Sequence, residues 1–189
     1  MKKYLLSYLL NFLLLILLMG CGSKKFYTLG DNIEVKNHHN FSQNIDVLKV
    51  KVPKYLQENK IVRQVSPYQI ELIDNTDWLI PMEKKLTQML IEYLQTSLNN
   101  PNVHLYPWES DNKTNIRVSV DIKKFIASKE VVVLKANYKI MNLEQRTHQL
   151  KSFETKKATT AKMEDMMRSM EEAYTLLLED IQTTIINNK

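Results

Sequence analysis

Apolar and polar residues alternate along several stretches of the chain, a pattern typical of half-buried β-strands. It is clearest in IDVLKVKV and IRVSVDIKKFI. By this criterion strands are predicted over residues 26–29, 45–52, 61–65, 68–72, 103–106, 116–126, 131–141 and 149–159. Ser66-Pro67 joins the third and fourth strands as a hairpin, and short polar links join the last three as an antiparallel meander. The polar cluster at residues 74–77 predicts a turn.

In two segments the apolar residues recur with the period of an α-helix. Residues 81–99 and 161–187 carry apolar side chains at spacings of three and four. Pro81 suits the first helical position of the earlier segment, and Asn99-Asn100-Pro101 ends it. The apolar stripe of the later segment consists of Met163, Met166, Met170, Ala173, Leu177, Ile181 and Ile185.

These elements together predict an α+β fold. Neither helix can bury its stripe on the other and still cover a sheet, so the simplest solution places both on one sheet face. The expected architecture is therefore a two-layer antiparallel β-sheet with two long amphipathic helices packed on one face.

The N-terminus has the organisation of a secretory signal peptide. A short basic start is followed by an apolar run over residues 4–19, shorter than the roughly 20 residues that span a bilayer. Leu18-Met19-Gly20-Cys21 resembles the bacterial lipobox, which implies cleavage before Cys21 and acylation of its thiol and new amino group. The expected organisation is a removed signal peptide (1–20), a lipidated tether (21–25) and a single periplasmic α+β domain (26–189). An uncleaved signal anchor is the alternative, but it would give Cys21 no use.

Composition excludes several classes of protein. Loss of residues 1–20 removes Lys2 and Lys3 and no acid, so the net charge falls from +5 to +3, too small an excess to indicate a nucleic-acid partner. All three glycines precede residue 31, which excludes a Gly-rich phosphate loop from the body of the chain. Cys21 is the only cysteine, so no disulfide can form within one chain.

Candidate catalytic and metal-binding residues are sparse. His38-His39 is an adjacent pair in a polar segment, without the ligand pattern of a zinc site, so no metal and no cofactor is expected. A Ser/His/Asp triad is spatial and stays open, but the sequence has no Gly-x-Ser-x-Gly elbow. We therefore expect a protein that is not an enzyme.

Three kinds of side chain have both a structural and a binding interpretation. The methionines at 163, 166, 167 and 170 suit a core stripe or, because Met167 lies off the stripe, an adaptable binding surface. Trp78 precedes a helix that must dock and is expected in the core. Trp108 suits a buried anchor and a partner contact equally well.

The order of short motifs along the chain resembles one known family. A lipobox is followed by Phe26-Tyr27-Thr28-Leu29, by Val52-Pro53-Lys54-Tyr55-Leu56 and then by Trp78-Leu79-Ile80-Pro81-Met82 at the start of a helix. The alternating strand at 116–126, the next strand and a long final helix complete the pattern. This order is similar to that of the PqiC/YmbA-type lipoproteins, auxiliary components of ABC-type and MCE-type intermembrane transport systems.

The resemblance implies a lipid-anchored protein on the periplasmic face of the outer membrane. Its partners would be an MCE-domain protein that bridges the periplasm and an ABC permease and ATPase system that moves lipid or another hydrophobic molecule. Gly22, in place of the Asp common in lipoproteins retained in the inner membrane, favours the outer membrane. A structural lipoprotein that assists assembly of an outer-membrane or secretion complex is the alternative, and homo-oligomer formation stays open.

Exposed turns with a bulky aromatic residue next to Pro are the expected partner contacts, namely Tyr55 and Trp108. Residues 22–25 span at most about 14 Å. A domain held by Cys21 must therefore stay close to its membrane.

Overall fold

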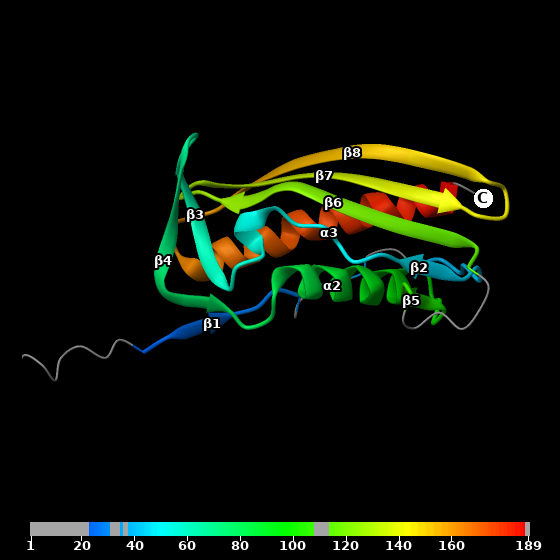
Figure 1. Ribbon diagram of the computed structural model, residues 1–189, viewed down its shortest axis with the longest axis horizontal. Coiled ribbons are helices and arrows are strands. Elements are labelled where there is room, and N and C mark those ends of the chain that lie inside the picture. Colours follow the sequence, from blue (N-terminus) through cyan, green and yellow to red (C-terminus); the bar gives the residue numbers. More distant parts are fainter. Residues whose placement is uncertain (1–22, 31–34, 36–37, 108–113, 188–189) are drawn as a thin grey trace, which may run out of the picture.

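The fold combines one large sheet with two long helices (Figure 1). The computed structural model describes residues 23–30, 35, 38–107 and 114–187. The strands are β1 (Lys25–Tyr27), β2 (Ile45–Val47), β3 (Lys60–Ser66), β4 (Gln69–Trp78), β5 (Val103–Leu105), β6 (Ile116–Ala127), β7 (Val131–Asn142) and β8 (Thr147–Ala158). The helices are a 3₁₀ turn, η1 (Lys54–Leu56), and the α-helices α2 (Met82–Ser97) and α3 (Met163–Asn187). The α+β class predicted from the sequence is confirmed.

The eight strands form a mixed sheet. β6, β7 and β8 make the predicted antiparallel meander, and β3 and β4 make the predicted hairpin. The expectation of a purely antiparallel sheet was wrong, because β1 runs parallel to β4, and β2 runs parallel to both β5 and β6. β3 also meets β6 in parallel, through Arg63 and Ala127. These parallel partners are far apart in the sequence, and alternation identifies a strand without identifying its neighbour.

Two local predictions also need correction. The cluster at residues 74–77 lies inside β4 and does not end it. Asn75 has a φ of 54°, and the pairing of β3 with β4 shifts register between Lys60 and Val62, so the polar cluster forms an irregularity within the strand. The strand expected over 45–52 is shorter, ends at Val47 and is continued only by a bridge between Lys51 and Asp121.

The two helices bury their apolar stripes in one core with the inner face of the sheet. The α3 stripe contributes Met166, Met170, Ala173, Leu177, Ile181 and Ile185 as buried residues. Met167 is 8% exposed, so the core interpretation of the methionine cluster is confirmed. Trp78, at 4% exposure, is also in the core as predicted.

Specific polar contacts join the two helices inside this core. The fully buried Tyr174 hydroxyl of α3 donates to the carbonyl of Leu86 in α2 at 2.8 Å. Tyr93 of α2 bonds Gln182 of α3 at 3.3 Å. Among the helices that the structure describes, none is long and apolar enough to cross a membrane.

Candidate partner-binding surfaces

The described chain starts beside the hairpin base. β1 begins at Lys25, four positions after Cys21, and pairs with the end of β4. Asp77 of β4 forms ion pairs with Lys24 and Lys60. Hydrogen bonds from Lys24 and then Lys60 lower the pKa of the Asp77 carboxyl. These pairs fix the first residues of β1 to the hairpin base, whereas Cys21 lies outside the described residues and its lipidation remains a prediction.

Tyr55 has a structural position in η1. Its side chain is partly buried, packs against the core, and its hydroxyl accepts a hydrogen bond from the backbone N–H of Phe125 at 2.9 Å. Burial raises the pKa of this hydroxyl. Phe125 follows the register shift between Ile122 and Lys124, so the Tyr55 hydroxyl binds β6 next to its irregularity. The neighbouring Lys54 is exposed, and a role for Tyr55 in partner binding remains a prediction.

Trp108 lies outside the described residues, but the chain that leads to it is well anchored. Tyr106 donates its N–H to the carbonyl of Val47 at 2.9 Å, and the Tyr106–Pro107 bond is cis. The guanidinium of Arg117 lies 4.0 Å from the centre of the Tyr106 ring and 3.5 Å from the buried Asp46 carboxylate. The residues immediately before Trp108 are thus held against β2 and β6.

Tyr55 and Tyr106, which is two residues before Trp108, lie at different ends of β6. Tyr55 binds Phe125, and Tyr106 stacks on Arg117, eight residues earlier in the strand. Eight residues of β-strand extend about 26 Å. Tyr55 and the segment before Trp108 therefore cannot form one compact contact site.

A groove runs along α2 close to the end of β5. Its volume is about 750 Å³. Of its lining residues Thr87 is buried, and Ile91, Gln95 and Leu105 are half-buried. Lys49 and Lys84 are among the residues around it. Leu105 directly precedes Tyr106, so the groove lies next to the part of the chain that leads to Trp108.

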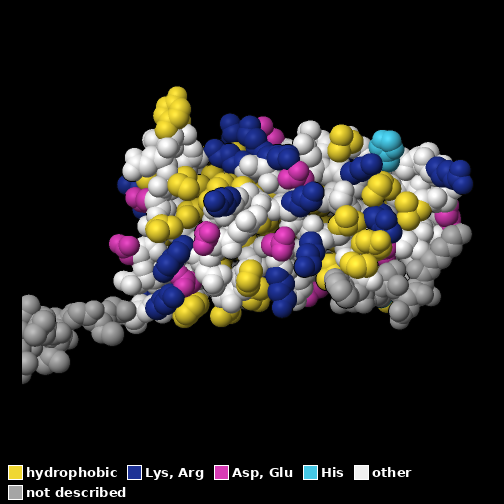
Figure 2. Space-filling view, viewed as in Figure 1, with side chains coloured by type: hydrophobic (Ala, Val, Ile, Leu, Met, Phe, Trp, Pro, Cys, Tyr) yellow, Lys and Arg dark blue, Asp and Glu magenta, His cyan; other side chains and the backbone are white. Residues whose placement is uncertain are grey.

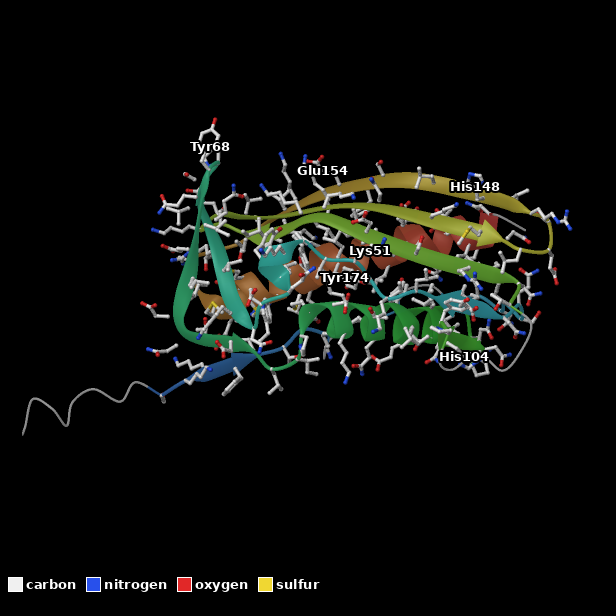
Figure 3. All side chains as sticks on the ribbon, viewed as in Figure 1. Lys51, Tyr68, His104, His148, Glu154 and Tyr174 are labelled. Atoms are coloured by element: carbon white, nitrogen blue, oxygen red, sulfur yellow. The ribbon has the colours of Figure 1, made fainter. Side chains whose placement is uncertain are left out.

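Sequence reasoning missed one feature, a concentration of exposed apolar side chains at the hairpin end. Among the described residues, nine large hydrophobic side chains are exposed. Six of them lie in β1, in the β3–β4 hairpin or directly after it: Phe26, Val65, Tyr68, Ile70, Leu72 and Leu79. Tyr68 at the hairpin tip is 99% exposed and projects beyond the sheet (Figure 3). Alternation predicts an apolar face for these strands, but it does not show that the face is left uncovered.

The histidines do not gather into a site. His104 lies near α2, and His148 is the second residue of β8 (Figure 3). His38 contacts the carbonyl of Thr96 at 3.3 Å. Within the described part of the chain, no cluster of three or more His, Cys, Asp or Glu side chains is arranged to hold a metal ion.

Comparisons with known proteins agree with this architecture. Two crystal structures share the fold. One is of an uncharacterized protein, with a TM-score of 0.71 and 19% identity, covering 87% of this chain and 99% of the other. The second is of protein XCC0632 from Xanthomonas campestris, family DUF330, with a TM-score of 0.70 and 14% identity, covering 87% and 96%. A search of curated proteins finds no match.

The match to a family covers most of the described chain. The family model for the ABC-type transport auxiliary lipoprotein component matches residues 27–182, from β1 into the last turns of α3. Its description agrees with the family that the order of motifs in the sequence resembles. The chain therefore belongs to the family of ABC-type transport auxiliary lipoprotein components.

Proposed function

We propose that this protein is the outer-membrane lipoprotein of an MCE/ABC-type intermembrane transport system for lipid or another hydrophobic molecule. Membership of the transport auxiliary lipoprotein family carries the proposal. In this role the chain binds a partner and performs no catalysis itself. Cys21 carries the lipid, and Gly22 after it favours the outer membrane.

The short tether supports a role at the membrane surface. The four residues 22–25 extend at most about 14 Å, so a lipidated Cys21 keeps the start of β1 within that distance of its attachment point. A domain held in this way can receive a protein that crosses the periplasm, but it cannot reach the opposite membrane. Several acyl chains on Cys21 make the attachment stable, because each buried methylene contributes about 0.8 kcal/mol.

The segment after β5 is the proposed partner contact. Trp108 follows a backbone held by Val47 and by the stacked pair of Tyr106 and Arg117. Trp is enriched among the residues that contribute most to binding at protein interfaces. The groove beside Leu105 adds partly apolar area next to this segment.

Affinity capture from crosslinked cells tests the proposal. The intact chain carries a C-terminal tag, cells are crosslinked before lysis, and the captured proteins are identified by mass spectrometry. We expect an MCE-domain protein or the permease of its ABC system. Capture of only barrel-assembly or secretion components would contradict the proposal and favour a structural lipoprotein.

A further inference from the structure

The hairpin β3–β4 crosses one end of the molecule, and β1 lies at that same end (Figure 1). Leu72 is 61% exposed, Ile70 is 50% exposed, and Tyr68 at the tip is almost fully exposed. Side chains so placed add nothing to the core of this chain. Their concentration on the β3–β4 hairpin indicates a binding surface.

The strand register puts Ile70 and Leu72 on the outer face of the sheet, away from the helices. Leu72 pairs with Val62, and Arg63 pairs with Ala127, which sets Val62 beside Ile126. Ile126 pairs with Val133 in turn. One apolar row therefore crosses β4, β3, β6 and β7. Leu72 is exposed in this row, whereas Val62 and Ile126 are buried. Figure 2 shows apolar side chains gathered where the hairpin meets the sheet.

Lysines border this apolar row. Lys156 pairs with Val133 at its end, and Lys124 pairs with Lys135 in the next row of the same face. Glu154 forms an ion pair with Lys135 at 2.8 Å. The hydrogen bond from Lys135, helped by the charges of Lys156 and Lys124, lowers the pKa of the Glu154 carboxyl. Three lysines against one glutamate leave the border positive.

The same outer face continues to β1. Lys60 and Val62 are two residues apart in β3, so they share a face, and Lys60 pairs with Asp77. Asp77 pairs with Phe26, which is 56% exposed. Phe26 is five residues from Cys21, so a lipid on Cys21 holds this end of the molecule within about 18 Å of the bilayer.

We infer that the hairpin end is a membrane-contacting surface that lies on the anionic headgroup layer of the bilayer holding the anchor. Tyr68, Ile70 and Leu72 enter the interface, and the bordering lysines face lipid phosphates. An exposed Tyr with apolar neighbours and flanking lysines suits the boundary between headgroups and acyl chains. The inference rests on the proposed lipidation of Cys21.

A bilayer fits this surface better than a protein partner does. The anchor already brings the surface to the membrane, so weak contacts act at high effective concentration. The contact would also fix the orientation of the domain and leave Tyr106, at the other end of β6, on the side that faces the periplasm.

Two exposed leucines on the same sheet face provide a matched test. Leu72 lies at the hairpin end, and Leu150 of β8, which pairs with Lys139, is 71% exposed towards the opposite end. Each is replaced by Cys in the mature lipidated chain, where acylated Cys21 leaves the new residue as the only free thiol. A polarity-sensitive fluorophore is attached, and the protein is placed in vesicles of phosphatidylethanolamine and phosphatidylglycerol with spin-labelled lipids.

We expect the Leu72→Cys probe to show blue-shifted emission and quenching by spin-labelled lipid, while the Leu150→Cys probe keeps the emission of a water-exposed dye. A water-like probe at position 72 in protein that floats with vesicles would overturn the inference and leave the anchor intact. A blue-shifted probe that lipid does not quench would also overturn it, because protein then covers the surface. Equal quenching at both positions would contradict a contact confined to the hairpin end.

Two further measurements distinguish a missing lipid anchor from a missing membrane contact at the hairpin. Mass spectrometry of the N-terminal peptide and flotation with vesicles report lipidation without reference to the probes. A chain that is unmodified at Cys21 and does not float would refute the proposed anchor and the inference together. A Tyr68→Cys probe at the hairpin tip repeats the measurement at a position whose side chain supports no core packing.

Discussion

Replacement of Leu177 by Ala tests whether α3 is held by its apolar stripe. Leu177 has 0% exposure and belongs to the core cluster shared by the sheet and both helices. The substitution removes three carbon atoms, which costs about 2.4 kcal/mol at roughly 0.8 kcal/mol per methylene. The residual cavity adds a further cost, and measured Leu→Ala substitutions in cores lie at about 2–5 kcal/mol. We therefore expect a loss of about 3–4 kcal/mol in the free energy of unfolding.

Urea denaturation followed by circular dichroism measures this loss. The midpoint should fall while the slope with urea stays unchanged, since the area exposed on unfolding hardly changes. Thermal unfolding should show a drop in Tm of about 10 °C, because about 2–4 °C correspond to each kcal/mol in a domain of this size.

An exposed residue of the same helix provides the control. The Thr183 side chain is exposed, and its hydroxyl bonds only back to the carbonyl of Glu179, at 2.8 Å. Thr183→Ala should change stability by no more than about 0.5 kcal/mol. If Leu177→Ala lowered stability no more than this control, the α3 stripe could not be a buried face and the packing described above would be wrong.

Three further predictions concern the anchor, the hairpin base and the helix pair. Cys21→Ser should abolish labelling by a fatty-acid probe and leave unprocessed precursor, and a processed, membrane-bound mutant would rule out this anchor. Because the pKa of Asp77 is lowered, its ion pairs stabilise the folded state above the ordinary carboxyl pKa, and the effect disappears as pH falls through the lowered value. Asp77→Asn should thus be less stable than the parent at pH 7, and the urea midpoints of the two proteins should converge as the pH falls through this lowered pKa; a gap independent of pH would contradict this. Tyr174→Phe should cost about 1 kcal/mol in urea denaturation, through loss of the bond to the Leu86 carbonyl, and an unchanged midpoint would show that this bond contributes nothing.

Much of the fold could be predicted because its elements are strongly periodic. The α3 stripe from Met166 to Ile185 and the alternation of β6 and β7 identify both the elements and their buried faces. Short polar links then make the β6–β7–β8 meander the natural connection.

Long-range pairing could not be predicted in this way. β2 and β5 are each three residues long, and their parallel neighbours depend on tertiary packing that leaves no local pattern. Asn75 shows the same limit within a strand, since a residue that tolerates positive φ suits a turn and a bulge equally well.

The candidate site was only partly accessible from sequence. An aromatic residue in a short turn after Pro53 identified Tyr55 as a surface residue, but this pattern could not show that the Tyr55 hydroxyl binds the Phe125 backbone. The exposed apolar side chains of the hairpin were missed because an apolar strand face gives the same pattern whether the protein or another surface covers it. Only the arrangement of β1, β3, β4 and β6 shows which side chains remain uncovered.

Photo-crosslinking from position 108 in living cells is the most direct test of the proposed partner-binding function. A photoreactive amino acid replaces Trp108 in one strain and Lys54 in a second strain. Lys54 is chosen because it is exposed, whereas replacing its neighbour Tyr55 would remove the hydrogen bond to Phe125. We predict that position 108 captures an MCE-domain protein of a transport system. Capture of only barrel-assembly or secretion components from both positions, with the protein folded and lipidated, would contradict the account.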